Sequence, residues 1–281
     1  MKSRILALAG QKQSGKTTAS NFLHGYQLRC HNIIKGFIVT DDGKLVIDTE
    51  VIRPDGQEET GKVFLDINRN DLEFAQWAAY SMWPYIKRYS FASPLKLIAV
   101  EMFGLTKDQC YGTDTQKNTL TNIKWGDMPD LPKGYSKNKK MTAREFLQYF
   151  GTDVCRKIKD DIWSDRCIRD IREESPLVAV IDDCRFVNEA DAVQRAGGKV
   201  IKFTRSAHKD SHSSESALND WENYDAIIDN ENMTINETCI EIIRLLTEWG
   251  WLGAEIKQQE IKPPEPELVG GIHKFKEDKQ E

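Results

Sequence analysis

Residues 10–17 read GQKQSGKT, an unbroken G-x-x-x-x-G-K-[ST] pattern, which is the pattern of a phosphate-binding loop. The apolar run 5–9 before it has the length of a β-strand, and the residues from Thr18 to about Tyr26 have the apolar spacing of a helix. A strand, a glycine loop and a helix are the context that this pattern requires. The sequence therefore predicts that a polyphosphate binds at residues 10–17.

Each residue type in this loop has a chemical reason. Gly10 and Gly15 let the backbone turn tightly and approach the phosphates, whose charge is met by loop N–H groups and by the positive end of the helix dipole. Lys16 is expected to reach the β- and γ-phosphates, and the Thr17 hydroxyl is expected to hold Mg²⁺. The loop alone does not say where the γ-phosphate goes.

Composition limits the other functions that the chain can have. Its 281 residues are 40% hydrophobic, which is enough for one sizeable core, and the formal charge of −5 argues against a surface that coats nucleic acid. The six cysteines include no C-x-x-C pair, so we expect reduced, mostly buried thiols and neither zinc nor a disulfide framework. No apolar run reaches the roughly 18 residues of a membrane span, and we expect no signal peptide and a cytosolic protein.

The second half of the chain alternates strands with helices. Residues 177–181 form a continuous apolar run typical of a buried parallel strand, and the runs 199–204 and 225–228 are also expected to be strands. Helices are predicted at about 188–196 and 234–249. This alternation indicates right-handed crossovers, so the predicted fold class is α/β with a doubly wound parallel sheet.

The first half adds further elements to this core. A β-hairpin is predicted at 36–48, and we interpret 36–70 as an insertion with additional strand within 51–67. We expect helices at 71–83 and from Pro94 to Gly104, on either side of a strand at 86–91, and a long mobile loop at 111–140. The Thr142 capping box opens a helix predicted to stop at Gly151, and a second helix is predicted at 153–172. The polar end, 255–281, is predicted to be a flexible charged tail.

Two carboxylates and an arginine follow the apolar run 177–181. Asp182, Asp183 and Arg185 lie at the carboxyl end of a core strand, where ligands of open α/β sheets bind. An Asp there can hold the Mg²⁺ shell, and we assign Asp182 to the metal, while Arg185 offers a planar fork for a phosphate monoester. The alternative is structural: Asp183 caps a helix and Arg185 pairs with Glu189 on the surface.

These segments resemble the phage-type deoxynucleoside monophosphate kinases, relatives of the adenylate and guanylate kinases. The resemblance covers residues 1–36 and 86 to about 248, in the family's order, and its most specific part is the Leu-Gln-x-x-Gly-Thr-Asp segment at 147–153. The other matching segments are 10–18, 91–96, Arg144, Trp163, 183–185 with Glu189, 198–205 and 212–215.

The resemblance implies a P-loop kinase domain over 1–254, with ATP and Mg²⁺ as cofactors and a lid at about 205–219. Catalytic roles are implied for Lys16, Asp183 and Arg185. ATP would contact Gly10, Lys12, Gln13, Ser14, Gly15, Lys16, Thr17, Thr18 and Arg205. The monophosphate would contact Lys96, Arg144, Gly151, Thr152, Trp163, Asp183, Arg185 and Glu189. For Trp163 the alternative is a place in the core, and for Lys96 it is an ordinary solvated lysine.

The predicted activity is ATP-dependent, Mg²⁺-assisted phosphorylation of deoxynucleoside 5′-monophosphates by in-line transfer. The acceptor phosphate has a second pKa of about 6, so no strong general base is needed. Two alternatives stay open: a kinase for another small acceptor such as dephospho-coenzyme A, and an inactive nucleotide-binding module. No membrane or nucleic acid partner is expected, and a homodimer is left open.

Overall fold

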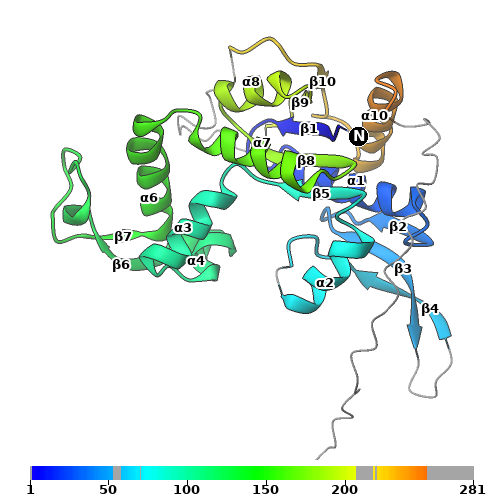
Figure 1. Cartoon of the computed structure of the whole chain (residues 1–281), viewed down its shortest axis with the longest axis horizontal. Coiled ribbons are helices and arrows are strands. Elements are labelled where there is room, and N and C mark those ends of the chain that lie inside the picture. Colours follow the sequence, from blue (N-terminus) through cyan, green and yellow to red (C-terminus); the bar gives the residue numbers. More distant parts are fainter. Residues whose placement is uncertain (1, 53–57, 70, 207–217, 219, 252–281) are drawn as a thin grey trace, which may run out of the picture.

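A five-stranded parallel sheet lies at the centre of the computed structural model, which describes residues 2–52, 58–69, 71–206, 218 and 220–251 (Figure 1). All neighbouring strands of this sheet are parallel, and β1 occupies the middle position. The strand order is β10 (Ala226–Ile228), β9 (Lys199–Phe203), β1 (Arg4–Ala9), β8 (Val178–Cys184) and β5 (Ile86–Tyr89). The predicted α/β class and parallel sheet are confirmed.

Helices cover both faces of this sheet, and the buried side chains of β1 and β8 alternate between two clusters. On β1, Leu6 and Leu8 face a cluster that includes α1 (Lys16–Cys30) and α10 (Ile235–Glu248). Ile5 and Ala7 face the opposite cluster, which includes α3 (Ser93–Phe103), α7 (Ile162–Glu174) and α8 (Val187–Arg195). The sheet is therefore doubly wound, as predicted, and its carboxyl edge carries the phosphate loop and residues 182–185.

The predicted insertion is a three-stranded antiparallel sheet made of β2 (Gly36–Val39), β3 (Leu45–Ile52) and β4 (Glu58–Phe64). It projects from the central sheet on the side opposite to β6 and β7 (Figure 1). The predicted hairpin is confirmed by the pairing of β2 with β3. The next helix, α2 (Leu72–Ser81), begins where Asp71 accepts a hydrogen bond from the backbone N–H of Phe74.

The segment predicted as a mobile loop, 111–140, contains regular structure, so that prediction is wrong. It holds the end of α4 (Lys107–Tyr111), α5 (Asp114–Lys117), β6 (Leu120–Lys124), a 3-10 turn at Trp125–Asp127, and the first residue of β7 (Lys140–Thr142). Trp125 is only 4% exposed and anchors the segment in a small core with Met141 and Phe146. A single buried tryptophan outweighs the polarity of its neighbours.

The helix that opens at Thr142 does not stop at Gly151, which corrects a second prediction. The capping box is confirmed, and α6 (Ala143–Gln148) runs directly into a π-helix, Tyr149–Arg156. Gly151 is needed for close packing rather than for a helix end, since a Cβ there would lie 2.7 Å from Cδ2 of Leu95. The following helix, α7, consequently begins at Ile162 and not at residue 153.

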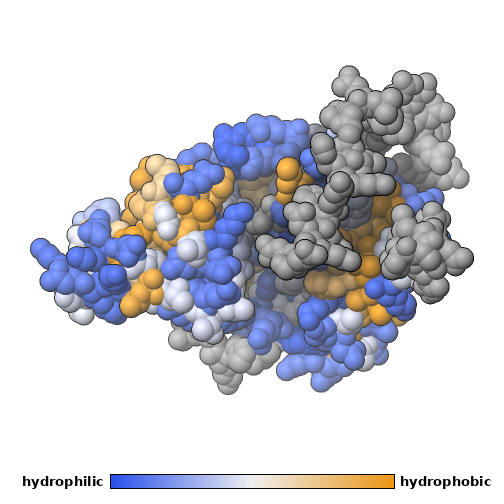
Figure 2. All heavy atoms as spheres, turned by 90° about the horizontal axis from the view of Figure 1, so that it is seen from below, coloured by the Kyte–Doolittle hydropathy of each residue, from blue (hydrophilic) through white to orange (hydrophobic). Residues whose placement is uncertain are grey.

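The surface is largely hydrophilic in the view of Figure 2, and its apolar residues gather in separate places rather than in one band. Within the described residues, no helix is long and apolar enough to cross a membrane. The cysteines are free thiols, and all but Cys30 are buried. The predicted tail and nearly all of the predicted lid lie outside the described residues, and the domain limits stay a prediction.

Candidate active site

The phosphate loop borders a cavity of about 470 Å³, which we call the donor cavity. Its wall also includes a turn of the insertion and the start of α10. Arg205 and Asn230, which follow β9 and β10 in the sequence, line it as well. The predicted ATP-binding residues that line it are Lys12, Gln13, Gly15, Lys16, Thr17, Thr18 and Arg205. The structure does not bring Gly10 and Ser14 to this wall: Ser14 is fully buried, and Gly10 packs against it.

The loop depends on backbone conformations that favour glycine. Gly10 has φ 141° and Gly15 has φ 102°, and Gln13 between them also has a positive φ of 63°. The Lys16 ammonium lies in the loop and donates to the carbonyl oxygens of Gly10 at 2.7 Å and Gln11 at 2.5 Å. The loop thus holds Lys16 in position before any phosphate binds.

Replacing Gly10 with alanine is expected to deform the loop, because the new Cβ would lie 2.7 Å from the Ser14 Oγ and 2.8 Å from the Phe203 carbonyl oxygen. We expect the free energy of unfolding to fall by about 1–3 kcal/mol and the affinity for ATP to fall at least about tenfold. Urea unfolding and calorimetric ATP titration measure the two effects. Gly104→Ala is the control, because Gly104 also has a positive φ but no atom within 4 Å of its Cβ position. Equal ATP affinity in both variants would contradict the prediction.

Asn230 lines the donor cavity, and sequence reasoning missed it. Its Nδ2 donates to the Ser14 carbonyl oxygen at 2.9 Å, and its Oδ1 accepts from the backbone N–H of Arg205 at 3.0 Å. The Arg205 Nε also donates to the Asn230 carbonyl oxygen at 3.1 Å. One buried amide therefore fixes Arg205 against the phosphate loop. Only its contact with Ser14, 216 positions away, reveals this role, and no local pattern marks it.

A second cavity of about 620 Å³, the acceptor cavity, lies beside the donor cavity. Lys12 lines both, so the two cavities share part of a wall. All eight residues predicted to contact the monophosphate line the acceptor cavity: Lys96, Arg144, Gly151, Thr152, Trp163, Asp183, Arg185 and Glu189. They come from α3, α6, the π-helix, α7, the end of β8 and α8. Side chains almost 100 residues apart thus meet in one cavity next to the phosphate loop.

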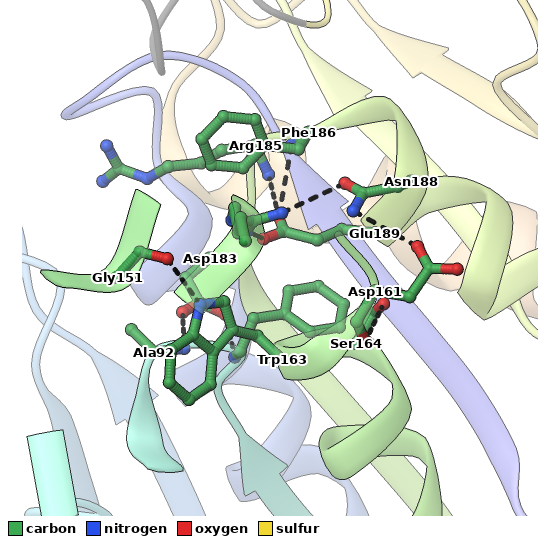
Figure 3. A network of polar contacts seen from close by, with 12 residues as sticks. Ala92, Gly151, Asp161, Trp163, Ser164, Asp183, Arg185, Phe186, Asn188 and Glu189 are labelled. Atoms are coloured by element: carbon green, nitrogen blue, oxygen red, sulfur yellow. Dashed lines mark hydrogen bonds and ion pairs between the residues drawn. The ribbon is translucent and has the colours of Figure 1, made fainter. Parts of the chain in front are cut away.

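Asp183 organises the wall of the acceptor cavity (Figure 3). Its carboxylate accepts hydrogen bonds from Ser90 Oγ at 2.5 Å and from the backbone N–H groups of Phe91 and Ala92 at 3.0 and 3.2 Å. The structural alternative, in which Asp183 caps a helix, does not describe this contact, because α3 has no side-chain cap and Asp183 instead holds the turn before it. It does so while facing the cavity, so the two roles do not exclude each other.

Glu189 is buried and lies between the start of α8 and the π-helix. Its carboxylate forms an ion pair with Arg156 and accepts hydrogen bonds from the backbone N–H groups of Arg185 at 2.9 Å and Phe186 at 3.2 Å. Burial is the main cause that raises the pKa of Glu189 to about 7, followed by the negative charge of Asp183. Figure 3 shows the Arg185 guanidinium directed away from the Glu189 carboxylate. The alternative in which these two side chains pair with each other does not describe this geometry.

The raised pKa of Glu189 predicts a pH-dependent stability. In the native state Glu189 stays protonated until the pH approaches its pKa of about 7, whereas in the unfolded chain it loses the proton near pH 4.5. Its contribution to the free energy of unfolding is therefore complete below pH 4.5 and lost by about pH 7. Relative to Glu189→Gln, the wild type is expected to lose up to about 3 kcal/mol of unfolding free energy over that interval. Urea unfolding of both proteins at several pH values measures the difference. Parallel pH profiles would contradict it.

The acceptor cavity carries an excess of positive charge. Seven cationic side chains and three carboxylates line it, and the carboxylates are Asp114, Asp183 and Glu189. The pKa of Lys96 is lowered, first by burial, and the pKa of Lys117 is lowered by burial and in part by the charge of Arg185. Sequence reasoning missed two of the cations, Arg88 and Arg156, and placed Lys117 in a loop that could cover the nucleotide. A site with this charge balance suits a phosphate dianion.

Asp114, which lines the acceptor cavity, was also missed. Its carboxylate lies 2.5 Å from the Lys12 Nζ and 2.7 Å from Arg144 Nη2. These two partners lower the pKa of Asp114 to about 2. An anion thus already sits between a residue of the phosphate loop and a residue of the acceptor cavity.

The predicted metal ligands differ in how well they fit. Thr17 lines the donor cavity at the start of α1. Asp182 lines neither described cavity, and its buried carboxylate forms a two-pronged ion pair with Arg88 at 2.8 Å. The assignment of the Thr17 hydroxyl to Mg²⁺ stays a prediction, for a residue on the wall of the donor cavity. The assignment of Asp182 stays a prediction that requires the metal to approach a carboxylate paired with arginine.

Trp163 is largely a core residue. It is 5% exposed, packs in the cluster under α7, and donates from Nε1 to the Gly151 carbonyl oxygen at 3.1 Å (Figure 3). This bond fixes the π-helix at the point where Gly151 and Thr152 line the acceptor cavity. π-Helical turns frequently occur at functional sites. Whether the indole also contacts the substrate stays a prediction.

Comparison with known proteins agrees with this arrangement. The family model described as deoxynucleotide monophosphate kinase matches residues 99–239, which is half of the chain. A relative from Acanthamoeba polyphaga mimivirus, named "Putative deoxynucleotide monophosphate kinase", is 36% identical over 172 residues, covering 55% of this chain and 79% of the relative. The chain belongs to the deoxynucleotide monophosphate kinase family. It is accordingly an enzyme of the phosphotransferase class, and the resemblance drawn from the sequence is confirmed. The family match begins after the phosphate loop and the insertion.

Proposed function

We propose that this protein transfers the γ-phosphoryl group of ATP to a deoxynucleoside 5′-monophosphate and releases the diphosphate and ADP. One observation carries the proposal: a cavity lined by the phosphate loop adjoins a positively charged cavity, and Lys12 belongs to both walls. The first cavity offers a place for a polyphosphate, and the second offers cations for a monophosphate. Two phosphorylated substrates side by side are what a monophosphate kinase requires.

In this mechanism the protein aligns the two substrates and neutralises the charge of their phosphates, and it needs no strong general base. The acceptor phosphate, with a second pKa of about 6, is already ionised near neutral pH. Lys16 approaches the β- and γ-phosphates of the donor, and Arg185 grips the acceptor phosphate through its planar fork. Asp183 keeps the turn before α3 in place through its bonds to residues 90–92. Mg²⁺, held by the Thr17 hydroxyl and the donor phosphates, would supply further charge neutralisation.

The remaining predicted residues have roles that this geometry supports. Arg205, fixed by Asn230, lines the donor cavity and is proposed to contact the base. Ser206, just after it, donates to Gln11 of the phosphate loop at 2.5 Å, so the start of the proposed lid is attached to that loop. We also propose that the protein acts in the cytosol, where ATP is available, and in the host cytosol if a phage encodes it.

A panel of acceptors tests the proposal. ATP and Mg²⁺ are incubated with each deoxynucleoside monophosphate, with the ribonucleoside monophosphates, and with dephospho-coenzyme A, and the products are separated by anion exchange. We expect a diphosphate from at least one deoxynucleoside monophosphate. Transfer to dephospho-coenzyme A alone would identify the rival kinase. ATP binding without any product would identify an inactive nucleotide-binding module.

A further inference from the structure

The insertion contributes a wall of the donor cavity. Its β2–β3 turn brings Asp41, Asp42 and Gly43 to the cavity beside Thr17 and Thr18. The phosphate loop and α10 supply the rest of the wall together with Arg205 and Asn230. Because the family match covers only residues 99–239, this wall belongs to a part of the chain that the match does not include.

The turn is fixed to α1. The Asn21 Nδ2 donates to the Gly43 carbonyl oxygen at 2.7 Å, and the backbone N–H of Gly43 donates to the Thr40 carbonyl oxygen at 2.8 Å. Gly43 has φ 79°, and a Cβ at this position would collide with the Thr18 Oγ1. Only glycine lets the turn come this close to the start of the helix. The turn is therefore held at a defined place on the cavity rim.

The two carboxylates of the turn have different surroundings. Asp42 pairs with Lys44 at 2.6 Å and accepts from the Thr40 hydroxyl, and these two contacts lower the pKa of Asp42. Asp41 is exposed and lines the cavity, and none of the described residues donates a hydrogen bond to its carboxylate. Asp42 thus holds the turn, while Asp41 is available to a ligand.

The chemistry of the three walls assigns the parts of the donor. Phosphates belong at the loop N–H groups and Lys16, and a carboxylate would repel them. The base suits the part of the wall that Arg205, Ile235 and Cys239 supply, which combines a guanidinium with apolar side chains. The acidic turn is left for the sugar, whose hydroxyls are hydrogen-bond donors that a carboxylate accepts. We propose that Asp41 accepts hydrogen bonds from the ribose hydroxyls of the donor nucleotide and thereby makes the site prefer a ribonucleotide donor.

This inference rests on the proposed function, and binding measurements test it apart from catalysis. ADP, 2′-deoxy-ADP and 2′,3′-dideoxy-ADP are titrated calorimetrically, with Mg²⁺, into the wild type, Asp41→Asn and Asp48→Asn. Asparagine suits a turn, so the first variant keeps the fold. Asp48 is the matched control, because it lies on β3 of the same hairpin and lines neither described cavity.

We expect the wild type to bind ADP about tenfold more tightly than dideoxy-ADP, which is the factor that a hydrogen bond to an exposed charged group typically supplies. Asp41→Asn should remove this difference by weakening ADP alone, and Asp48→Asn should retain it. Equal affinity of the wild type for the three nucleotides would overturn the inference. So would an equal loss for all three in Asp41→Asn, since the turn would then contact the phosphate end. If the wild type bound ADP but transferred no phosphoryl group, the proposed function would fail while the ribose contact stood.

Discussion

Changing Lys16 to methionine should lower kcat for phosphoryl transfer by about 10²–10³-fold, the usual cost of removing one group that stabilises transition-state charge. The Lys16 ammonium already lies inside the phosphate loop, bonded to the carbonyl oxygens of Gly10 and Gln11. Methionine keeps the length of the side chain but has no charge to offer the γ-phosphate. A coupled assay of ADP release at saturating ATP and acceptor measures the effect.

Lys62→Met is the matched control for this variant. Lys62 lies on β4 of the insertion and lines neither described cavity, so the same chemical change there should leave kcat within about twofold of the wild type. Urea unfolding of both variants separates loss of catalysis from loss of fold. Activity above a tenth of the wild-type value in Lys16→Met would remove this lysine from the reaction.

Changing Arg185 to lysine should lower kcat/KM for the monophosphate acceptor by about 10- to 100-fold, the range expected for a hydrogen bond to a charged group. Arg185 lines the acceptor cavity and is directed away from Glu189 (Figure 3). Lysine retains the charge but loses the planar fork that matches two phosphate oxygens. Initial rates at varied acceptor concentration and saturating ATP give the value, and ATP affinity should be unchanged.

Arg195→Lys is the control for the arginine change. Arg195 ends α8 on the surface, where its side chain is 61% exposed and 3.8 Å from Asp161. The substitution should therefore have little effect, because exposed ion pairs at this separation contribute little. If Arg185→Lys and Arg195→Lys behaved alike toward the acceptor, Arg185 would not be the residue that grips its phosphate.

Those parts of the fold that depend on local pattern could be predicted from the sequence. The buried runs that became β1, β8 and β9, the capping box at Thr142 and the apolar spacing of 234–249 gave elements close to those observed. Continuous apolar runs of strand length and cap residues act over a few residues, so one sequence is enough to reveal them. The same locality explains why the phosphate loop was found with its flanking strand and helix.

The errors occurred where tertiary packing overrides local pattern. In the π-helix Gly151 and Arg156, five residues apart, line one cavity. The sequence prediction assumed an α-helix, and it therefore ended the helix at the glycine. Trp125 organises a segment whose composition otherwise indicates a loop. Neither effect can be read from neighbouring residues, because each depends on a core built by distant elements.

The candidate site was predicted where a family motif marked it and missed where only distant pairing reveals it. The eight acceptor residues lie in matched segments, and they do meet in one cavity. Arg88 lies on the edge strand β5 and pairs with Asp182 across 94 positions, and Asn230 reaches Ser14 across 216. Their side chains carry no local signal, since a polar residue near a strand end is ordinary.

The position of Lys12 has a thermodynamic consequence. Because one ammonium group belongs to both cavities and is already engaged by Asp114, ligands in either cavity act on the same charge. Binding of one ligand must then alter the affinity for the other, and linkage makes this factor identical in both directions. Two negatively charged ligands, one in each cavity, compete for the Lys12 ammonium. Their binding equilibria are therefore coupled without any movement of the sheet.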